Sequence, residues 1–334
     1  RGKFKFFGVG AEYDLTSKEW LDLRQSVLDK EAKAKKGERA AYVFMDFLKD
    51  EVREEAKVDA GKTRLISSAP LDYVVLWRMY FGAFSMAFMQ NHTLSGMAPG
   101  ICAYSDWSDL AAVLQRKGPL VFDGDFSAFD ASEQPSFHWP ILDFINEWYD
   151  DGEVNALVRR VLWMELVHSR HIGGRGRNQC VVYQWYKSLP SGHPFTTIVN
   201  SMYSLSIIVA SYGIATGNVR DFWDKCGAVT YGDDNVVNPH ESIADKFNQV
   251  TLAKILGEHF GMTYTPGRKD GKWTPTTSID QVTFLKRGFR FENKKWLAPL
   301  ELSSFLFTCY YSKNQELRDD IIRDNLELAL AELS

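Results

Sequence analysis

Cysteine is scarce in this chain of 334 residues, and its spacing argues against two classes of protein. The sequence has no CxxC pair and no cysteine with a histidine at zinc-ligand spacing. The four cysteines are Cys102, Cys180, Cys226 and Cys309. This pattern is typical neither of a zinc module nor of a disulfide scaffold, and it favours free thiols in a reducing compartment.

No segment is predicted to span a membrane either. The most apolar stretch, residues 71–90, carries Asp72 and Arg78. Charged side chains inside a membrane span are costly, so we predict a buried helix there and not a membrane span. No signal-peptide pattern opens the sequence.

The chain lacks the excess of basic residues that is common in nucleic-acid binders. Its formal net charge is −4, from 39 basic and 43 acidic residues. The basic residues are nevertheless clustered, at 30–39, 159–177, 268–272 and 286–295. Such clusters can line a positive channel, although solvated surface charge is the simpler interpretation for about half of them. A hydrophobic content of 45% excludes disorder, and the length suits one to three domains.

Hydrophobic patterning predicts helices and antiparallel hairpins in an order that fits an α+β fold, a sheet with helices on one face. Helices are expected over 16–35, 38–57, 71–88, 137–149, 154–168, 195–212, 243–260 and 314–333. Strands or hairpins are expected over 62–68, 119–125, 179–186, 228–238 and 281–296.

Two acidic motifs carry the strongest chemical signal. The run Tyr-Gly-Asp-Asp at 231–234 lies between two short apolar stretches, and Asp125 and Asp130 follow a predicted strand. Adjacent carboxylates repel one another unless a cation lies among them, and Mg²⁺ is held by carboxylates together with substrate phosphates. Two such ions about 3.5–4 Å apart form the clamp of polymerases and nucleases. We therefore predict a nucleotide polymerase.

The ordered series of motifs over about residues 45–334 resembles the palm of viral RNA-dependent RNA polymerases of the picorna-like positive-strand group, most closely the dicistrovirus-like enzymes. The resemblance implies that Asp125 and Asp233 are the principal metal ligands and that Asp234 contributes less directly. It also implies that Asp130 reads the ribose 2′-hydroxyl. The neighbouring Asp123 is assigned to the strand and not to the metals.

A further motif, at residues 191–200, lies between the two acidic motifs, in the order that the family shows. Ser191 precedes a predicted helix on which Thr196 and Asn200 share one face, because they are four residues apart. In isolation this pattern would indicate only the start of a helix. The resemblance implies that Ser191 and Asn200 bond Asp130 and the ribose, with Thr196 nearby. No chemistry is assigned to His193.

Basic residues complete the resemblance on both sides of the acidic motifs. Lys269 corresponds to the lysine near the leaving pyrophosphate and is a candidate general acid, although a loop lysine is more commonly just solvated. The resemblance implies that Lys286 and Arg287 grip the primer strand through its phosphates. Upstream, Lys49 and Arg64 match best the residues that neutralise the triphosphate, with Arg53 and Lys62 as companions.

The resemblance implies a right-hand polymerase fold: a palm with an antiparallel sheet and helices on one face, partial fingers and the start of a thumb. Residues 1–118 would be partial fingers with the segment that lines the nucleotide channel, 119–150 palm, 151–190 a fingers insertion, 191–280 palm, and 281–334 the primer-grip hairpin and the start of the thumb. The 47 residues after Arg287 are too few for a whole thumb, so a core fragment is expected.

The activity implied is RNA-directed nucleotidyl transfer from NTPs to an RNA 3′-hydroxyl by two metal ions, in the replication of a positive-strand viral genome. The cofactor would be two Mg²⁺ ions, with Mn²⁺ as an alternative. The expected partners are RNA template and primer, NTPs, a genome-linked protein primer and other viral replication proteins. The expected location is the cytoplasm of an infected cell, in membrane-associated replication complexes.

Three other functions share part of this pattern. A reverse transcriptase, or another palm polymerase, would have the same metal carboxylates but would reject ribose, whereas Asp130, Ser191 and Asn200 favour ribose. A degenerate or truncated polymerase core that acts as an RNA-binding or assembly module would be marked by loss of a metal carboxylate, and both Asp125 and Asp233 are present. A metal-dependent nuclease leaves the Ser/Thr/Asn motif unexplained.

Overall fold

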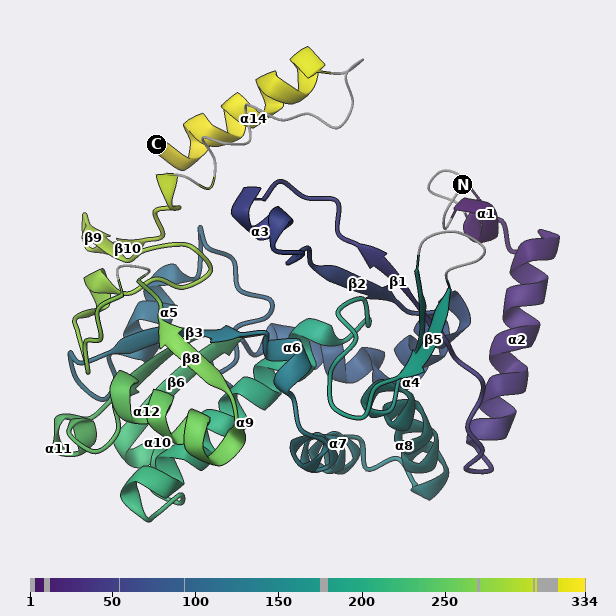
Figure 1. The fold of residues 1–334 in the computed structure, drawn as a ribbon, viewed down its shortest axis with the longest axis horizontal. Coiled ribbons are helices and arrows are strands. Elements are labelled where there is room, and N and C mark those ends of the chain that lie inside the picture. Colours follow the sequence, from purple (N-terminus) through teal and green to yellow (C-terminus); the bar gives the residue numbers. More distant parts are fainter. Residues whose placement is uncertain are drawn as a thin grey trace. The chain divides into compact units, whose positions relative to one another are not determined.

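The computed structural model describes residues 4–8, 13–53, 55–92, 94–174, 180–268, 271–302, 304 and 318–333. The chain forms two compact units. The first unit comprises residues 1–87 and 128–199, and the second comprises residues 88–127 and 200–334. Each unit has a four-stranded sheet of its own (Figure 1). The assignment of the predicted segments to fingers, palm and thumb stays a prediction.

The sheet of the first unit has the strand order β2-β1-β4-β5. Its strands are β1 (Phe44–Leu48), β2 (Leu65–Ser68), β4 (Arg170–Gly173) and β5 (Val181–Gln184). β1 pairs antiparallel with β2 and parallel with β4, and β4 pairs antiparallel with β5. Two segments that are far apart in the sequence thus meet in one sheet, because β1 and β4 are neighbours.

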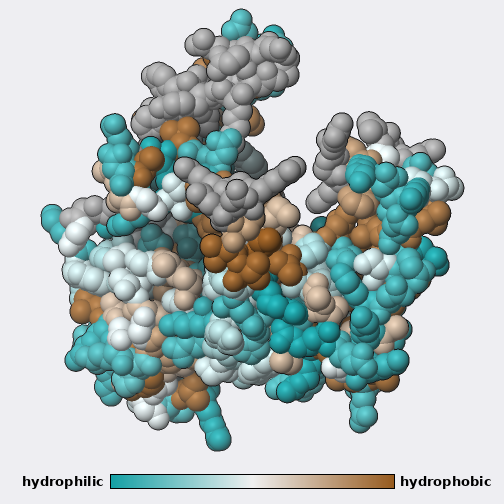
Figure 2. Space-filling view, turned by 45° about the vertical axis from the view of Figure 1, so that its right-hand side comes forward, coloured by the Kyte–Doolittle hydropathy of each residue, from teal (hydrophilic) through white to brown (hydrophobic). Residues whose placement is uncertain are grey.

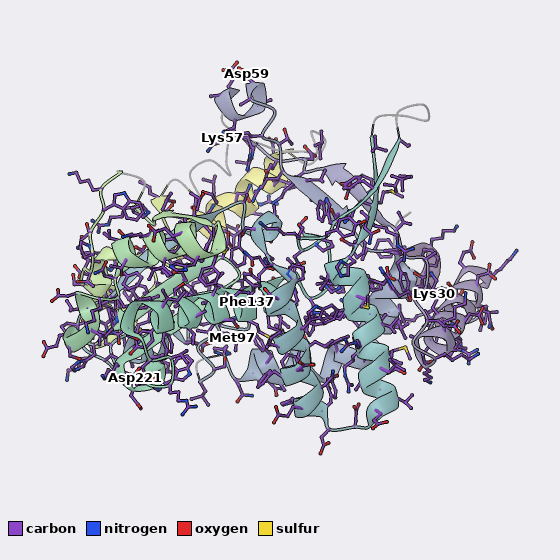
Figure 3. All side chains as sticks on the ribbon, turned by 60° about the horizontal axis from the view of Figure 1, so that its bottom comes forward. Lys30, Lys57, Asp59, Met97, Phe137 and Asp221 are labelled. Carbon is purple, nitrogen blue, oxygen red and sulfur yellow. The ribbon has the colours of Figure 1, made fainter. Side chains whose placement is uncertain are left out.

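Helices supply the aromatic core of the first unit. Trp77 stacks on Phe81 with ring centroids 4.0 Å apart, and the His193 ring meets Trp77 edge-on at 4.2 Å. The helices of this unit include α1 (Phe4–Phe7), α2 (Lys18–Ala34), α3 (Glu55–Asp59), α4 (Leu71–Gln90, which continues into the second unit), α6 (Phe129–Ser132), α7 (Pro135–Tyr149) and α8 (Glu153–Val167). The short helix α3 is exposed throughout, and its residues Lys57 and Asp59 are labelled in Figure 3.

The helix predicted over 38–57 is wrong, because this segment contains β1 and only the first residues of α3. Its side chains alternate with period two, the signature of a strand. Phe44 is fully buried, whereas Met45 and Phe47 are about half exposed. The inward-facing Asp46 made the segment look polar and helical, but its carboxylate accepts hydrogen bonds from the buried His171 and from the Tyr183 hydroxyl.

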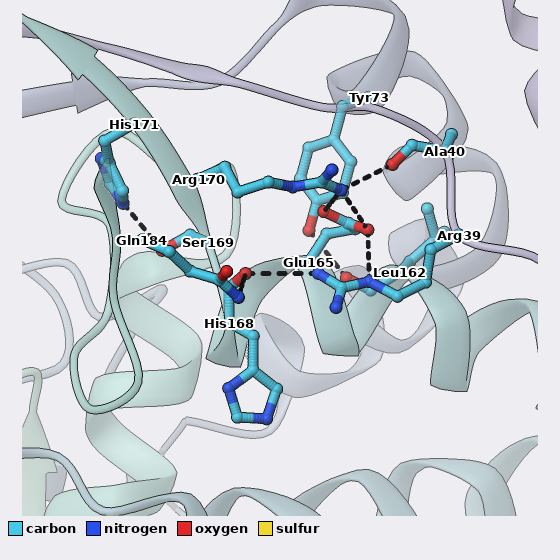
Figure 4. A network of polar contacts seen from close by, with 10 residues as sticks. All are labelled: Arg39, Ala40, Tyr73, Leu162, Glu165, His168, Ser169, Arg170, His171 and Gln184. Atoms are coloured by element: carbon cyan, nitrogen blue, oxygen red, sulfur yellow. Dashed lines mark hydrogen bonds and ion pairs between the residues drawn. The ribbon is translucent and has the colours of Figure 1, made fainter. Parts of the chain in front are cut away.

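A buried carboxylate ties α8 to the loop after α2 and to β4 (Figure 4). Glu165 is fully buried and accepts hydrogen bonds from Arg39 Nε at 2.7 Å and from Arg170 Nη2 at 2.9 and 3.0 Å. The same Arg170 nitrogen donates to the Ala40 carbonyl at 2.8 Å. Two cations therefore offset the desolvation of one buried anion, and they connect three segments of the chain.

The sheet of the second unit has the strand order β6-β7-β3-β8, and all its pairs are antiparallel. Its strands are β3 (Phe122–Ser127), β6 (Cys226–Tyr231), β7 (Asp234–Pro239) and β8 (Thr263–Pro266). A smaller hairpin of β9 (Arg290–Glu292) and β10 (Lys295–Leu297) belongs to the same unit. The predicted strand over 119–125 and the hairpin over 228–238 are thereby confirmed.

Helices pack against this second sheet, α12 on β3 and β8 and α5 on β6 and β7. The helical elements of this unit include α5 (Trp107–Leu114), α9 (Thr196–Thr216, which begins in the first unit), α10 (Phe222–Lys225), α11 (Glu241–Ala244), α12 (Gln249–Ile255), a π-helical turn (Leu256–Phe260), a 3₁₀ turn (Ile279–Gln281) and α14 (Arg318–Leu333). By length and composition alone α9 could cross a membrane, but 67% of its apolar stretch is buried inside the protein, as in a core helix.

Most other predicted elements are confirmed, with shifted bounds, and several short elements were missed. The predicted helix 243–260 is split, because the Asn248 side chain caps a new helix by accepting hydrogen bonds from the backbone of Val250 and Thr251. Strands β4 and β8 and helices α1, α5, α6 and α10 had no prediction. The region predicted as one hairpin over 281–296 contains two tight turns, and part of the predicted helix 314–333 lies outside the described residues.

Replacing Glu165 by Gln should lower the free energy of unfolding by about 2–4 kcal/mol. This is slightly less than the roughly 3–5 kcal/mol typical of a broken buried pair, because the Arg39 and Arg170 side chains are 32% and 34% exposed. Urea unfolding measures the change. The control is Glu147→Gln on the exposed side of α7, where a change within about 0.5 kcal/mol is expected. Equal midpoints for the two variants would contradict the role given to Glu165.

Candidate active site

Three acidic residues lie at one end of the second sheet. The ladder between β3 and β7 runs from Phe122↔Val237 to Gly124↔Asn235, so the next residue of each strand is Asp125 and Asp234. Asp234 also pairs with Tyr231 across the β6–β7 hairpin, and Gly232 and Asp233 form its tip. Gly232 has φ +64°, a conformation that suits glycine, and its N–H donates to Ser201 Oγ at 2.8 Å. The tip is thereby fixed to α9.

The three carboxylates share one electrostatic field. The pKa of Asp234 is raised from 3.8 to about 6, first by burial and then by the negative charges of Asp233 and Asp125. The nearby ammonium of Lys286 opposes this rise in the pKa of Asp234. Asp125 and Asp233 are exposed, and Asp234 is half-buried. An ionised Asp234 is therefore unfavourable unless further positive charge comes close.

The side chain of Asn235, next to these carboxylates in the sequence, connects three strands by hydrogen bonds. Asn235 Nδ2 donates to the carbonyls of Gly124 at 3.2 Å and of Asp233 at 3.0 Å. Its Oδ1 accepts from the buried Tyr264 hydroxyl at 2.7 Å. At Gly124 a side chain is excluded, because a Cβ there would lie 2.2 Å from the Tyr264 ring. Sequence reasoning missed Asn235 and Tyr264, although an asparagine directly after the acidic pair was the available signal.

Asp123 lies inside β3, and its carboxylate is used by the structure around it. It is 5% exposed and accepts hydrogen bonds from Thr283 N at 2.9 Å and Thr283 Oγ1 at 3.4 Å. Burial raises the pKa of Asp123, and the bonds from Thr283 lower it. A Cβ at Gly267 would lie 2.4 Å from Asp123 Oδ2, so only glycine fits there. Asp123 thus joins β3 to the segment before the turn at Leu285 and Lys286, and the loop after β8 lies close against its carboxylate.

The donor set at the sheet end fits a hard divalent cation. Asp125, Asp233 and Asp234 supply only oxygen atoms, and their mutual repulsion would be relieved by Mg²⁺. Within the described part of the chain, no group of three or more His, Cys, Asp or Glu side chains is arranged to hold an ion by itself. Mg²⁺ usually completes its coordination with water and substrate phosphates, which the chain does not have to supply.

The predicted primer-grip residues, Lys286 and Arg287, have different surroundings. Phe284 and Arg287 exchange backbone hydrogen bonds of 2.9 Å around a two-residue turn, with φ +54° at Leu285 and +60° at Lys286. The Lys286 side chain is exposed. Arg287 instead donates to the Glu332 carboxylate at 2.6 and 2.8 Å and to the Ala298 carbonyl at 2.8 Å. Arg287 therefore anchors α14.

In the first unit, the loop that carries Ser191 is bonded to two neighbouring segments. The Asp130 carbonyl accepts from Leu189 N and from Ser188 Oγ, both at 2.9 Å. Ser191 Oγ donates to the Leu65 carbonyl of β2 at 3.0 Å. Thr196 Oγ1 donates to the His193 carbonyl at 2.8 Å. The hydroxyls expected near the ribose thus hold the loop itself in this structure.

His193, to which the sequence assigned no chemistry, fixes the same loop. Phe195 N–H donates to His193 Nδ1 at 3.1 Å, so the ring proton is on Nε2. Nε2 lies 3.0 Å from the Tyr73 hydroxyl, which donates to the Leu162 carbonyl at 3.1 Å. Burial lowers the pKa of His193 well below its ordinary range, which keeps the ring neutral.

Three of the four basic residues predicted to bind the triphosphate surround one carboxylate. Glu51 lies 3.3 Å from Lys49 Nζ, 2.9 Å from Arg53 Nε and 2.7 Å from Arg64 Nε. The hydrogen bond from Arg64, with the help of Lys49, holds the pKa of Glu51 at about 2. The fourth residue, Lys62, is exposed, and its carbonyl accepts from Arg53. Sequence reasoning missed Glu51.

The remaining predicted residues belong to different units or lie outside the described residues. Asn200 is buried in α9 and belongs to the second unit, whereas Asp130, Ser191 and Thr196 belong to the first. Lys269 lies outside the described residues. In the described second unit, the structure brings the carboxylates together with Lys286. In the described first unit, it gathers Lys49, Arg53 and Arg64 around Glu51 and joins Thr196, at the start of α9, to the Ser191 carbonyl.

Known proteins match almost the whole length of this chain. The family model described as "Viral RNA-dependent RNA polymerase" matches residues 13–333. The replicase polyprotein of Acute bee paralysis virus (strain Rothamsted) is 35% identical over 350 residues, which cover 100% of this chain and 18% of that polyprotein. The replicase polyprotein of Drosophila C virus (strain EB) is 33% identical over 351 residues, covering 99% of this chain and 20% of that polyprotein. The chain thus spans about a fifth of the length of these curated relatives.

A solved structure titled "Sicinivirus 3Dpol RNA dependent RNA polymerase" has the same fold, with a TM-score of 0.73 at 21% identity. The superposition covers 93% of this chain and 66% of that one. The predicted α+β polymerase fold is therefore confirmed. The extent of the family match, together with the carboxylates at the end of the β3–β7 ladder, leads to one conclusion: this chain belongs to the viral RNA-dependent RNA polymerases.

Proposed function

We propose that this chain is the catalytic core of an RNA-dependent RNA polymerase that extends an RNA 3′-hydroxyl with NTPs on an RNA template, in the replication of a positive-strand viral genome. One observation carries the proposal: the pairing of β7 with β3 and with β6 brings Asp125, Asp233 and Asp234 to the end of the β3–β7 ladder. There the pKa of Asp234 is raised, first by burial and then by the charges of the other two carboxylates. Such a cluster is costly to the folded protein and gains a purpose when it holds cations that bind phosphates.

The residues divide between the metal ions, the triphosphate and the primer. Asp125, Asp233 and Asp234 would hold the two Mg²⁺ ions, which when bound activate the attacking hydroxyl and stabilise charge on the leaving group. Lys49, Arg53, Lys62 and Arg64 bind the triphosphate of the nucleotide. Their cationic side chains neutralise the charge that spreads over the phosphate oxygens during transfer.

Selection of ribose and contact with the primer are assigned to polar and basic residues of the sequence motifs. Asp130, Ser191, Thr196 and Asn200 select the ribose, and Lys286 contacts primer phosphates. Arg287 supports that contact by fixing the turn. Lys269, from its place in the family motif, protonates the leaving pyrophosphate.

The proposed cofactor is a pair of Mg²⁺ ions, and Mn²⁺ can replace them because it accepts the same oxygen ligands. The proposed partners are an RNA template and primer, a genome-linked protein primer and other viral replication proteins. The proposed location is the cytoplasm of an infected cell, in membrane-associated replication complexes. The first test is primer extension on a homopolymeric RNA template, with and without a chelator.

Replacing Asp233 by Asn should slow primer extension more than about 100-fold, because even the partners of metal ligands contribute about 10–100-fold. Single-turnover extension with Mg²⁺ measures the effect. The control is Asp224→Asn, an exposed acidic residue of α10 in the same unit, which should leave the rate near that of the parent chain. Retention of the parent rate by the Asp233 variant would remove Asp233 from the site.

Replacing Asn200 by Ala should narrow the preference for ribonucleotides over deoxyribonucleotides. A polar group left without the ribose hydroxyl costs about 1–3 kcal/mol, so the ratio of kcat/KM values should change about 5–150-fold. RNA affinity should change much less. Ser206→Ala, which removes a hydroxyl bonded within α9 to Met202, is the control. An unchanged ratio in the Asn200 variant would count against ribose selection by this residue.

Replacing Asp234 by Asn should stabilise the chain when EDTA removes divalent cations. The folded-state pKa of Asp234 is about 6, above the ordinary value of 3.8, so the parent chain loses stability as the pH rises through this window. The variant has no such loss. Its Tm should therefore exceed that of the parent chain at pH 7.5, by a few degrees, and the difference should disappear near pH 4.

Mg²⁺ provides the control for this comparison. It should raise the Tm of the parent chain more than that of the Asp234 variant, because binding to the folded state stabilises it. Identical melting curves in EDTA at pH 7.5 would show that the ionised Asp234 carboxylate does not destabilise the folded chain.

A further inference from the structure

We propose that Glu51 competes with the nucleotide triphosphate for the same cations: it gathers Lys49, Arg53 and Arg64 in the absence of nucleotide and exchanges with the phosphates when a nucleotide binds. The inference rests on the proposed function, because it concerns the regulation of the triphosphate site. It makes Glu51 a positioning residue that sets nucleotide affinity and pyrophosphate release.

The geometry of the cluster makes the competition direct. Arg64 grips Glu51 through two nitrogens, Nε on Oε1 and Nη2 on Oε2. This forked arrangement is the one that arginine uses for carboxylate and phosphate alike. Arg53 Nε and Lys49 Nζ are directed at the same carboxylate, at 2.9 and 3.3 Å. A phosphate that takes these donors has to displace Glu51 from them.

The backbone holds the cluster in place while its side chains stay free to exchange. Lys49 directly follows β1 and Arg64 directly precedes β2, and Lys49 N donates to the Arg64 carbonyl at 2.8 Å. Their side chains are 40% and 57% exposed. Ion pairs at such exposed positions contribute little net stability, because water screens them and the long side chains lose entropy. Exchange of these partners for a ligand therefore costs little free energy.

Charge determines the direction of the effect. Three cations and one carboxylate leave the cluster with a net charge of +2. A triphosphate is attracted by the cations and repelled by Glu51, so the carboxylate weakens binding of the nucleotide. After transfer the same carboxylate competes with pyrophosphate for the cations and favours its departure. Removal of the charge should therefore tighten both ligands and delay release.

A purely structural role for Glu51 predicts the opposite result. If the carboxylate served only to align the cations, its removal would let them spread apart, and phosphate binding would weaken. The two roles differ in the sign of one affinity change.

The experiment measures binding of inorganic tripolyphosphate to the full chain by calorimetry at an ionic strength of about 0.15 M, where distant surface charges are screened. Glu51→Gln keeps the size of the side chain and removes its charge. We expect the Kd of the variant to fall about 2–10-fold, in keeping with the strength of exposed ion pairs. In extension assays the KM for NTP and the inhibition constant of pyrophosphate should fall by similar factors, and kcat should fall with them.

Two further variants make the result specific. Glu55→Gln removes the same charge from the exposed first turn of α3 and should leave the Kd within about 1.5-fold, since surface charges at a distance are screened. Arg64→Ala should weaken binding. A Kd for Glu51→Gln that is equal to or higher than that of the parent chain overturns the proposal, and so does a parent chain that does not bind tripolyphosphate.

The outcome is independent of whether the chain polymerises. If the parent chain binds tripolyphosphate and Glu51→Gln binds it more tightly while neither extends a primer, the polymerase function fails and the role of Glu51 stands. If the parent chain extends primers and the Glu51 variant shows no gain in affinity, the role of Glu51 is wrong and the polymerase function stands.

Discussion

Repulsion among three carboxylates at one end of a sheet is the constraint on which the second unit depends. The strands beneath must keep Asp125 and Asp234 adjacent although burial and charge oppose the ionised form of Asp234. Asn235 supplies this restraint, because its side chain bonds β3, its own hairpin and, through Tyr264, β8. The absence of a side chain at Gly124 lets the Tyr264 ring lie against the strand. Neutral hydrogen bonds and close packing thus fix the positions of charges that would otherwise separate.

The first unit uses the reverse arrangement, because its cations are gathered by carboxylates. Fully buried Glu165 binds Arg39 and Arg170 permanently, since neither partner could leave without stranding a charge inside the protein. Glu51 gathers Lys49, Arg53 and Arg64. The Lys49 and Arg64 side chains are exposed, and solvent makes such ion pairs easier to exchange. The depth of the carboxylate therefore decides whether an ion pair holds the fold or is available to a ligand.

Sequence patterns predicted those parts of the site that depend on neighbours in the chain. The hairpin at 231–234 and the strand before Asp125 follow from local apolar runs and a glycine turn, and both are found. Partners that are remote in sequence were not predictable in this way. Asp46 is turned inward by His171, 125 residues away, and without that partner its strand resembles a polar helix. Glu51 was passed over because only the folded arrangement brings Arg64, 13 residues on, to its side.

Lys286 and Arg287, the two basic residues predicted to grip the primer, have different roles in the structure. The resemblance treats Lys286 and Arg287 alike, but Arg287 is committed to Glu332, 45 residues away, and to the Ala298 carbonyl. That commitment fixes one end of a turn in which Leu285 and Lys286 both have positive φ, a conformation that costs free energy without glycine. The strain persists because the surrounding contacts outweigh it. Lys286 is exposed in this turn and lies close enough to Asp234 for its ammonium to oppose the rise in the pKa of Asp234. The ammonium that is proposed to contact a primer phosphate thus also interacts with the acidic cluster, and the contacts of the neighbouring Arg287 fix the turn that carries it.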